Sequence, residues 1–302
     1  MRLYAFLDPD DQAVVGALED EDTVKPLGVG LRDLLEDGSL GDPGRLAAEV
    51  ATIEERQDRS TLRPAAPIRP GKIICVGLNY RAHAAEGGRG VPDRPLLFAK
   101  FSNTVIGDGA DVVRPEGTHA LELEVELGVV IGRTAHRVPV EGAMAHVAGY
   151  VVANDISARD WQGNLQALRE GEKGDGQWLR AKGSDTFLPM GPVFVTADEL
   201  DPVAGVRLQS SHLPGPGRPG EGTSMPMQDS TTADMIFGVA ELIAHISKVI
   251  TLEPGDVILT GTPSGVGVFR DPPIFLEPGD RVRCEIEGIG SVENPIVDWS
   301  DA

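Results

Sequence analysis

The sequence predicts an α+β fold that is mainly β, and three observations lead to this prediction. Apolar segments of strand length recur along the chain, and clusters of Gly, Pro, Asp and Asn separate them. One segment, residues 235–246, has strong helical spacing of its apolar residues, with Asp234 placed to cap its N-terminus. The 302 residues are 41% hydrophobic and include 37 glycines and 23 prolines, a composition that supports a packed core. The expected strands are 72–77, 121–131, 147–153, 193–195, 257–260 and 281–286.

The N-terminal part is predicted to form a small separate domain at residues 1–62. Short apolar runs alternate there with acidic turns, and a helical pattern follows at 46–53. Residues 63–70 contain three prolines, whose fixed φ and missing N–H exclude a regular helix or a central strand. We therefore expect a stiff linker at 63–70 and a larger domain at 71–302.

The charge and the cysteines limit the classes of partner and the compartment. The formal net charge of −20 repels phosphate backbones and anionic lipid heads, so neither nucleic acid nor a membrane surface is an expected partner. No apolar stretch approaches the roughly 20 residues that span a bilayer, and the N-terminus reaches Asp8 too early for a signal peptide. Cys75 and Cys284 lie in apolar runs and indicate small core residues in a reducing compartment. We expect a cytoplasmic protein.

A row of carboxylates marks the strand predicted at 121–131. Alternation places Glu122, Glu124 and Glu126 on one face of this strand and leucine and valine on the other. Like charges on one face repel, so the row must either face bulk water or be neutralised by a cation. The apolar continuation at 128–131 is typical of a strand buried on both faces, which favours the cation.

A further oxygen ligand follows the next strand. Asp155 comes directly after the apolar run at 147–153 and can complete the site, although Asn-Asp at a strand end is also typical of a turn or helix cap. Because only oxygen ligands are present, hard-ion preferences favour Mg²⁺, with Mn²⁺ or Ca²⁺ as alternatives and Zn²⁺ disfavoured.

Two other segments contain candidate catalytic groups. His83 and Glu86 share one face of a short helix predicted within 79–86, where the carboxylate can orient the imidazole of a general base. Lys182 lies in a polar gap between apolar segments and can stabilise a developing oxyanion. The alternative for these residues is an ordinary surface helix and a surface lysine.

Two glycine-rich segments are expected to form loops. The segment 261–267 lacks the spacing of a phosphate loop or a dinucleotide site, but its N–H groups and the Thr262 hydroxyl suit a carboxylate. Residues 210–228 are rich in Pro and Gly, which predicts a loop and leaves open whether it closes over a site.

Taken in order, these segments resemble the fumarylacetoacetate hydrolase family, including its acylpyruvase and 2-hydroxyhepta-2,4-diene-1,7-dioate isomerase branch. The similarity extends over residues 72–297. It rests on the following motifs: 76–80 with His83 and Glu86, 124–127, 153–160, Lys182 with 185–187, and 260–267. The resemblance implies a mixed β-sandwich roll that is usually dimeric. It also implies Mg²⁺ or Mn²⁺ bound by Glu124, Glu126 and Asp155, with Glu122 outside the ligand set.

The resemblance further implies a small anionic 2-oxo acid as substrate. His83, supported by Glu86, would activate water, Lys182 would help to hold an enolate, and Gln162 and Thr262 match positions that hold the substrate. Leu123 stands where the family often has an aromatic residue, and the loop at 210–228 is longer than usual.

The leading prediction is a metal-dependent hydrolase that cleaves a C–C bond of a 2,4-dioxo acid such as an acylpyruvate or fumarylpyruvate. The alternative is an isomerase or decarboxylase of a related 2-oxo diacid at the same site, because these reactions share an enolate. A hypothesis from another class is a non-catalytic metal-binding or ligand-binding protein, which loss of His83, Glu86 or Lys182 would have indicated; all three are present.

Overall fold

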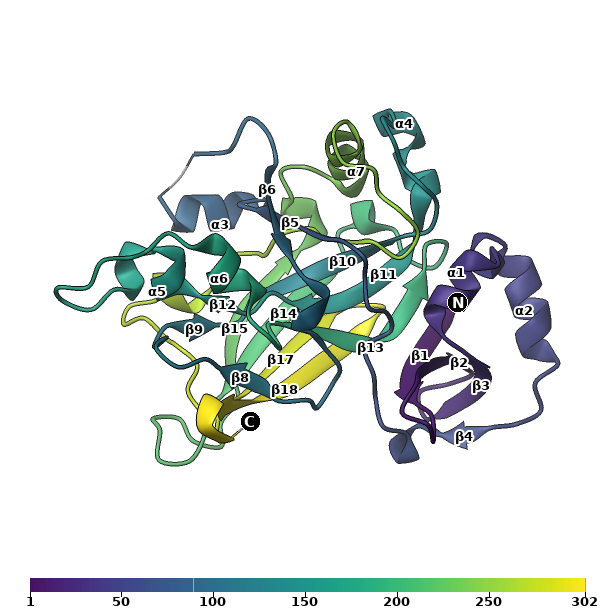
Figure 1. The fold of residues 1–302 in the computed structure, drawn as a ribbon, viewed down its shortest axis with the longest axis horizontal. Helices are drawn as coiled ribbons and strands as arrows, with labels where there is room; N and C mark the ends of the chain where they lie inside the picture. The colour runs from purple at the N-terminus through teal and green to yellow at the C-terminus, as the bar shows by residue number, and fades with distance from the viewer. Residues whose placement is uncertain (89, 302) are drawn as a thin grey trace.

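The computed structural model describes residues 1–88 and 90–301, and β-strands form most of its framework (Figure 1). The larger of its main sheets has eleven strands and is mixed, because β5 and β16 pair in parallel whereas most other neighbours are antiparallel. In spatial order its strands are β4 (Gln57–Asp58), β3 (Thr23–Val29), β2 (Ala13–Leu18), β1 (Arg2–Leu7), β13 (Leu188–Thr196), β11 (Val147–Asn154), β10 (Val125–Ile131), β16 (Val257–Leu259), β5 (Ile73–Gly77) and β6 (Leu96–Lys100), with β7 (Val105–Ile106) paired to β13.

A second sheet of five strands packs against the first. Its order is β15 (Met225–Thr231), β14 (Arg207–Leu213), β17 (Arg281–Ile286), β18 (Gly290–Asp298) and β8 (Val112–Arg114), and a separate pair joins β12 (Ser157–Ala158) to β9 (Leu121–Glu122). Val125, Leu127 and Val129 of β10 share one apolar cluster with Val282 and Cys284 of β17. The main hydrophobic core therefore lies between the two sheets, as expected for a mixed β-sandwich.

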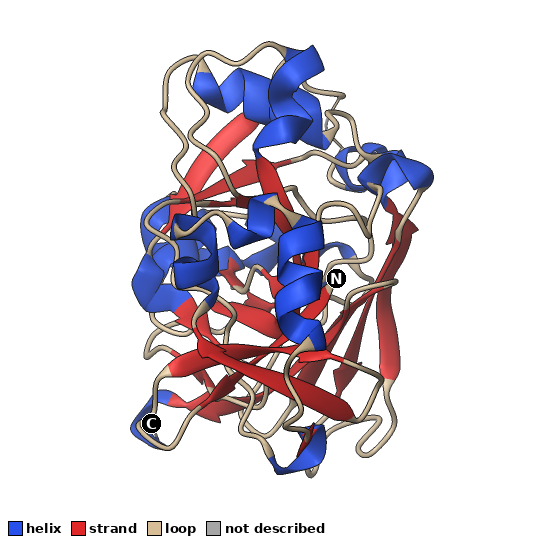
Figure 2. Cartoon of the chain, turned by 90° about the vertical axis from the view of Figure 1, so that its right-hand side faces the viewer, coloured by secondary structure: helices blue, strands red, loops and turns tan. Residues whose placement is uncertain are grey.

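Helices lie around this framework, as Figure 2 shows. They are α1 (Leu31–Glu36), α2 (Pro43–Ala51), α3 (Arg81–Glu86), α4 (Val140–Ala143), α5 (Arg159–Gln162), α6 (Trp178–Gly183) and α7 (Val239–Ser247). In Figure 1, α3, α5 and α6 lie together on the left-hand side of the molecule, and α5 and α6 contact β12. No helix within residues 1–88 and 90–301 is both long and apolar enough to cross a membrane.

The N-terminal strands continue the large sheet. Strand β1 pairs with β13, and Leu3 and Ala5 share a second apolar cluster with Val130 and Phe194. Residues 63–70 contain no helix and no strand, as their prolines predict. The predicted division into domains at 1–62 and 71–302 stays a prediction, as does the cytoplasmic location. Both cysteines are buried and free, as their apolar surroundings predict.

The strand predicted at 121–131 is wrong in one detail, because it is divided into β9 and β10. At the break, the N–H of Glu124 donates to the side chain of Asn154 at 3.0 Å, and the carbonyl of Glu124 accepts from Asp155 N at 2.9 Å. These bonds to the chain end of β11 replace regular strand pairing.

The helix predicted at 235–246 begins four residues later than expected. Gly238 is the N-cap residue of α7, and its N–H donates to the Glu241 carboxylate at 2.8 Å. Asp234 does not cap this helix; its carboxylate accepts from Ala82 N at 3.1 Å and so supports the first turn of α3.

The loop predicted at 210–228 is also wrong in extent, because β14 and β15 form a hairpin that leaves only residues 214–224 as its loop. The buried carboxylate of Asp280 holds this loop through the Gly215 N–H at 2.8 Å and through Arg218. Composition indicated a loop here because proline and glycine are frequent, but it did not reveal the strands on either side.

Candidate active site

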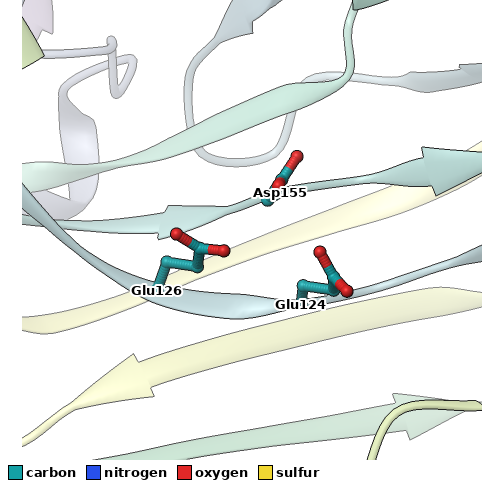
Figure 3. A group of neighbouring side chains, drawn as sticks. All are labelled: Glu124, Glu126 and Asp155. Atoms are coloured by element: carbon teal, nitrogen blue, oxygen red, sulfur yellow. The ribbon is translucent and has the colours of Figure 1, made fainter. Parts of the chain in front are cut away.

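Three buried carboxylates converge where β9, β10 and β11 meet. Glu124 and Glu126 project from one segment toward the neighbouring strand, where Asp155 follows β11 (Figure 3). These three residues are at most 3% exposed, and one oxygen from each lies within 4.8 Å of the others. The alternative of a carboxylate row facing bulk water is therefore wrong.

Three cationic side chains surround this group. Lys182 of α6 lies with its Nζ 2.5 Å from Glu124 Oε2 and 2.7 Å from Asp155 Oδ2. Lys100, at the end of β6, is fully buried and places its Nζ 2.7 Å from Asp155 Oδ1. Arg159 of α5 pairs with both Glu122 and Glu124. The alternative of Lys182 as a surface lysine is also wrong, since this residue is 2% exposed.

Glu122 belongs to a separate ion pair beside the cluster. One of its carboxylate oxygens contacts Arg159, and the other accepts from Val268 N at 2.7 Å. Glu122 is therefore satisfied without a metal, which agrees with its position outside the expected ligand set.

The electrostatic environment shifts the pKa values of Glu124 and Glu126 in opposite directions. Burial alone would raise the pKa of Glu124, but the charges of Arg159 and Lys182 outweigh burial and lower this pKa to about 2. Burial and the carboxylates of Asp155 and Glu124 raise the pKa of Glu126 well above its usual value. The Gly261 N–H, at 2.8 Å, is the one hydrogen-bond donor to Glu126 in the described part of the chain, and no cationic side chain pairs with it there.

The donor set fits a divalent cation. Three carboxylates, each with one oxygen within 4.8 Å of an oxygen of the others, supply the oxygen donors that Mg²⁺, Mn²⁺ and Ca²⁺ prefer. Glu126 is a buried carboxylate without a cationic side chain among the described residues, and a bound cation supplies the missing charge. Glu124, Glu126 and Asp155 can therefore hold a divalent metal, and their role as its ligands stays a prediction.

His83 and Glu86 form the pair that their spacing predicts. On α3, His83 Nδ1 lies 3.2 Å from Glu86 Oε2, and the imidazole is 6% exposed. The Gly265 N–H donates to both oxygens of Glu86, at 3.0 and 3.2 Å, so the loop after β16 fixes the carboxylate. Because Nδ1 faces Glu86, Nε2 is the ring nitrogen left to exchange a proton with a substrate.

Two adjoining cavities share a wall that includes His83, and the inner one reaches the carboxylates. The inner chamber has a volume of about 50 Å³, and its walls include Glu124, Glu126, Lys182 and Thr262. The outer chamber has a volume of about 240 Å³ and opens to the surface. Five residues line both chambers and so mark their junction: Leu78, His83, Arg159, Gln162 and Trp178.

The two predicted substrate-binding residues both line the inner chamber. Gln162 Oε1 accepts from Arg159 at 2.7 Å, which leaves the amide NH₂ of Gln162 as a donor to a substrate oxygen. The Thr262 hydroxyl donates to the Val125 carbonyl at 2.9 Å and accepts from Gln228 at 2.6 Å, so its hydrogen is already used. A substrate-binding role stays a prediction for both residues.

Sequence reasoning missed Lys100 and gave no role to Arg159. Lys100 is the last residue of an apolar strand, a position where lysine is usually exposed. Its contact with Asp155 depends on the tertiary fold, so the local sequence does not reveal it. Arg159 follows Asp155 by four residues, and its place after an acidic strand end was the one available signal.

Comparisons with known proteins identify the family. Residues 72–297 match the family described as fumarylacetoacetate (FAA) hydrolase, C-terminal. The chain belongs to the fumarylacetoacetate hydrolase family. It is 43% identical to the human mitochondrial oxaloacetate tautomerase FAHD2A over 253 aligned residues. The aligned region covers 83% of this chain and 74% of the human protein. The match to the bovine mitochondrial oxaloacetate tautomerase FAHD2A is 43% over 267 residues and covers 88% and 79% of the two chains.

Solved structures of the fumarylacetoacetate hydrolase family agree with the fold. The chain is similar to a 5-carboxymethyl-2-hydroxymuconate delta-isomerase from Mycobacterium smegmatis, with a TM-score of 0.74, 34% identity and 99% of each chain covered. It is also similar to a fumarylacetoacetate hydrolase from Exiguobacterium antarcticum, with a TM-score of 0.78, 30% identity and 99% of each chain covered. The α+β, mainly β fold is confirmed, and the protein is an enzyme of this superfamily.

Proposed function

We propose that this protein is a keto–enol tautomerase of 2-oxo diacids of the oxaloacetate type. The observation that supports the proposal most is the position of His83, held by Glu86 at the junction of the two chambers and across from the carboxylate cluster. Tautomerisation needs one group that exchanges a proton with C3 of the substrate and positive charge near the oxygen on C2. The site provides both.

The relatives favour this reaction over C–C hydrolysis. The curated relatives compared above are oxaloacetate tautomerases, and one of the similar structures is an isomerase. The alternative in the sequence analysis is therefore supported better than its leading prediction of a hydrolase. Both reactions share an enolate, which explains why motifs alone did not separate them.

Different residues of the chain have different roles in the proposed reaction. His83 Nε2 takes a proton from C3 of the keto form, and Glu86 stabilises the resulting imidazolium through Nδ1. Lys182 contacts both Glu124 and Asp155 in the inner chamber and stabilises the negative charge that develops on the C2 oxygen. Gln162, whose Oε1 accepts from Arg159, orients the substrate by donating its amide N–H to a substrate oxygen. A divalent cation held by the three carboxylates would act as a Lewis acid on the 2-oxo acid.

The test starts from enol-oxaloacetate and follows two readouts in the same reaction. Loss of the enol absorbance reports tautomerisation, and a lactate dehydrogenase coupled assay reports pyruvate release. We expect enol loss well above the buffer rate with no matching pyruvate. Metal-dependent release of pyruvate from acetylpyruvate, without acceleration of enol loss, would instead establish the hydrolase.

A further inference from the structure

The two chambers differ in chemical character. The inner chamber contains the charged groups, whereas four apolar or aromatic side chains dominate the outer one: Leu78, Leu165, Trp178 and Phe269. The rest of the wall of the outer chamber consists of Asn164, Gln166 and two glycines, together with His83, Arg159 and Gln162 at the junction with the inner chamber. At about 240 Å³ against about 50 Å³, the outer chamber is the larger space, and a substituent on C3 that is too large for the inner chamber extends into it.

The outer chamber offers no free positive charge among the residues that the structure describes. Arg159 is the cationic side chain in its wall, and the carboxylates of Glu122 and Glu124 already pair with this guanidinium. A carboxylate placed in this chamber would lose hydration without gaining a cationic partner, which is unfavourable. An uncharged, apolar group would instead gain from contact with the aromatic walls.

Leu78 is a second and independent indication. Its φ is +56°, in the left-handed region that glycine adopts freely and that leucine rarely adopts. The chain nevertheless has a leucine here, with its side chain in the wall that both chambers share. Backbone strain of this kind persists at functional sites where the side chain itself is needed.

We propose that the site also takes 2-oxo acids with an uncharged apolar substituent on C3, of which the 3-aryl acid phenylpyruvate is the simplest probe, and that Leu78 helps to select them. This inference rests on the proposed tautomerase function and extends its substrate class. The carboxylate and the C2 oxygen occupy the inner chamber, and the aryl group occupies the outer one.

The reaction balances without a co-reactant. In the keto-to-enol direction the C3–H bond breaks and His83 receives the proton. The electron pair forms the C2–C3 double bond, the C2 oxygen receives a proton from a water molecule, and His83 returns its proton to the solvent. The position of His83 in the walls of both chambers places this step where the substituent leaves the inner chamber.

The experiment measures kcat/KM for enol-phenylpyruvate and enol-oxaloacetate with the purified full chain in the presence of Mg²⁺. We compare wild type with Leu78→Asn, which tolerates positive φ but removes apolar surface, and with Leu78→Met, which keeps apolar surface. Wild type should act on both substrates. The ratio of phenylpyruvate to oxaloacetate efficiency should fall about tenfold in Leu78→Asn, the effect of a few methylene contacts, and should fall less in Leu78→Met.

A second variant covers the case in which Leu78→Asn does not fold. Leu165 is 81% exposed at the rim of the outer chamber, so Leu165→Gln removes apolar surface without disturbing the core. It should lower the same ratio by less than the roughly tenfold expected for Leu78→Asn, because most of the Leu165 side chain faces solvent.

The outcomes separate the inference from the proposed function. Turnover of oxaloacetate without turnover of phenylpyruvate overturns the inference and leaves the tautomerase function standing. An unchanged ratio in both Leu78→Asn and Leu165→Gln overturns the role of the outer chamber. Failure with both substrates refutes the proposed function, and the inference with it.

Discussion

Asp280 provides a quantitative test of how the long hairpin is held in place. Its fully buried carboxylate lies 2.8 Å from His212 Nε2, accepts from the N–H groups of Gly215 and Glu277 at 2.8 and 2.9 Å, and pairs with Arg218. Burial by itself would raise the pKa of Asp280, but these partners outweigh burial and lower the pKa from 3.8 to about 2. We therefore expect Asp280→Asn to destabilise the protein.

The magnitude follows from this difference in pKa. A shift from 3.8 to about 2 corresponds to about 2 kcal/mol of stability for the ionised form of Asp280. Because the folded pKa lies below the unfolded one, this stabilisation is fully present above about pH 4 and is lost as the pH falls through about 2. At pH 3 about half of it should remain.

The assay is urea-induced unfolding of wild type and Asp280→Asn at pH 6 and pH 3. The free energy of unfolding of the variant should be lower by about 2 kcal/mol at pH 6 and by about 1 kcal/mol at pH 3. Asp229→Asn is the matched control on the same hairpin, because Asp229 forms an exposed pair with Arg207 that contributes less than about 1 kcal/mol. A deficit that does not change with pH, or that matches the control, would refute this reasoning.

Three further predictions concern the candidate site. His83→Gln should lower the rate of tautomerisation by about 10²–10⁴-fold, whereas His136→Gln, at an exposed position, should leave it unchanged; stopped-flow kinetics of enol loss measure both. Removal of divalent cations with EDTA should lower the melting temperature, and the loss of stability should be about 2.7 kcal/mol if the metal was present at 100 times its Kd. Glu126→Gln should lower the metal affinity at least about 10-fold in a calorimetric titration. Lys100→Met should cost about 3 kcal/mol of unfolding free energy in urea, because Asp155 loses one of its two cationic partners, whereas the exposed Lys248→Met should cost almost nothing.

The local pattern of the sequence was enough to predict much of the candidate metal site. Period-2 alternation placed Glu124 and Glu126 on one face, and the apolar residues that follow them indicated that this face is buried. Spacing of three residues placed His83 and Glu86 on one face of a helix. Both predictions depend on spacings of two or three residues, so they can be made from the sequence alone.

The contacts that sequence reasoning missed are long-range. Lys100 reaches the carbonyl of Phe187 across 87 positions of the chain, and no local pattern predicts that pairing. Asp234 was expected to cap the helix that follows it, but tertiary contact brings it to Ala82 instead. The strand at 121–131 divides because Asn154 takes the Glu124 N–H, a bond that depends on the neighbouring strand.

The most direct test of the central claim is exchange of the C3 hydrogens of oxaloacetate in D₂O, followed by proton NMR with Mg²⁺ present. The proposed function predicts that wild type accelerates deuterium incorporation at C3, that His83→Gln does not, and that oxaloacetate is not consumed faster than in buffer. Conversion to pyruvate at the rate of exchange, or equal exchange by His83→Gln, would contradict proton transfer by His83 as the function of this site.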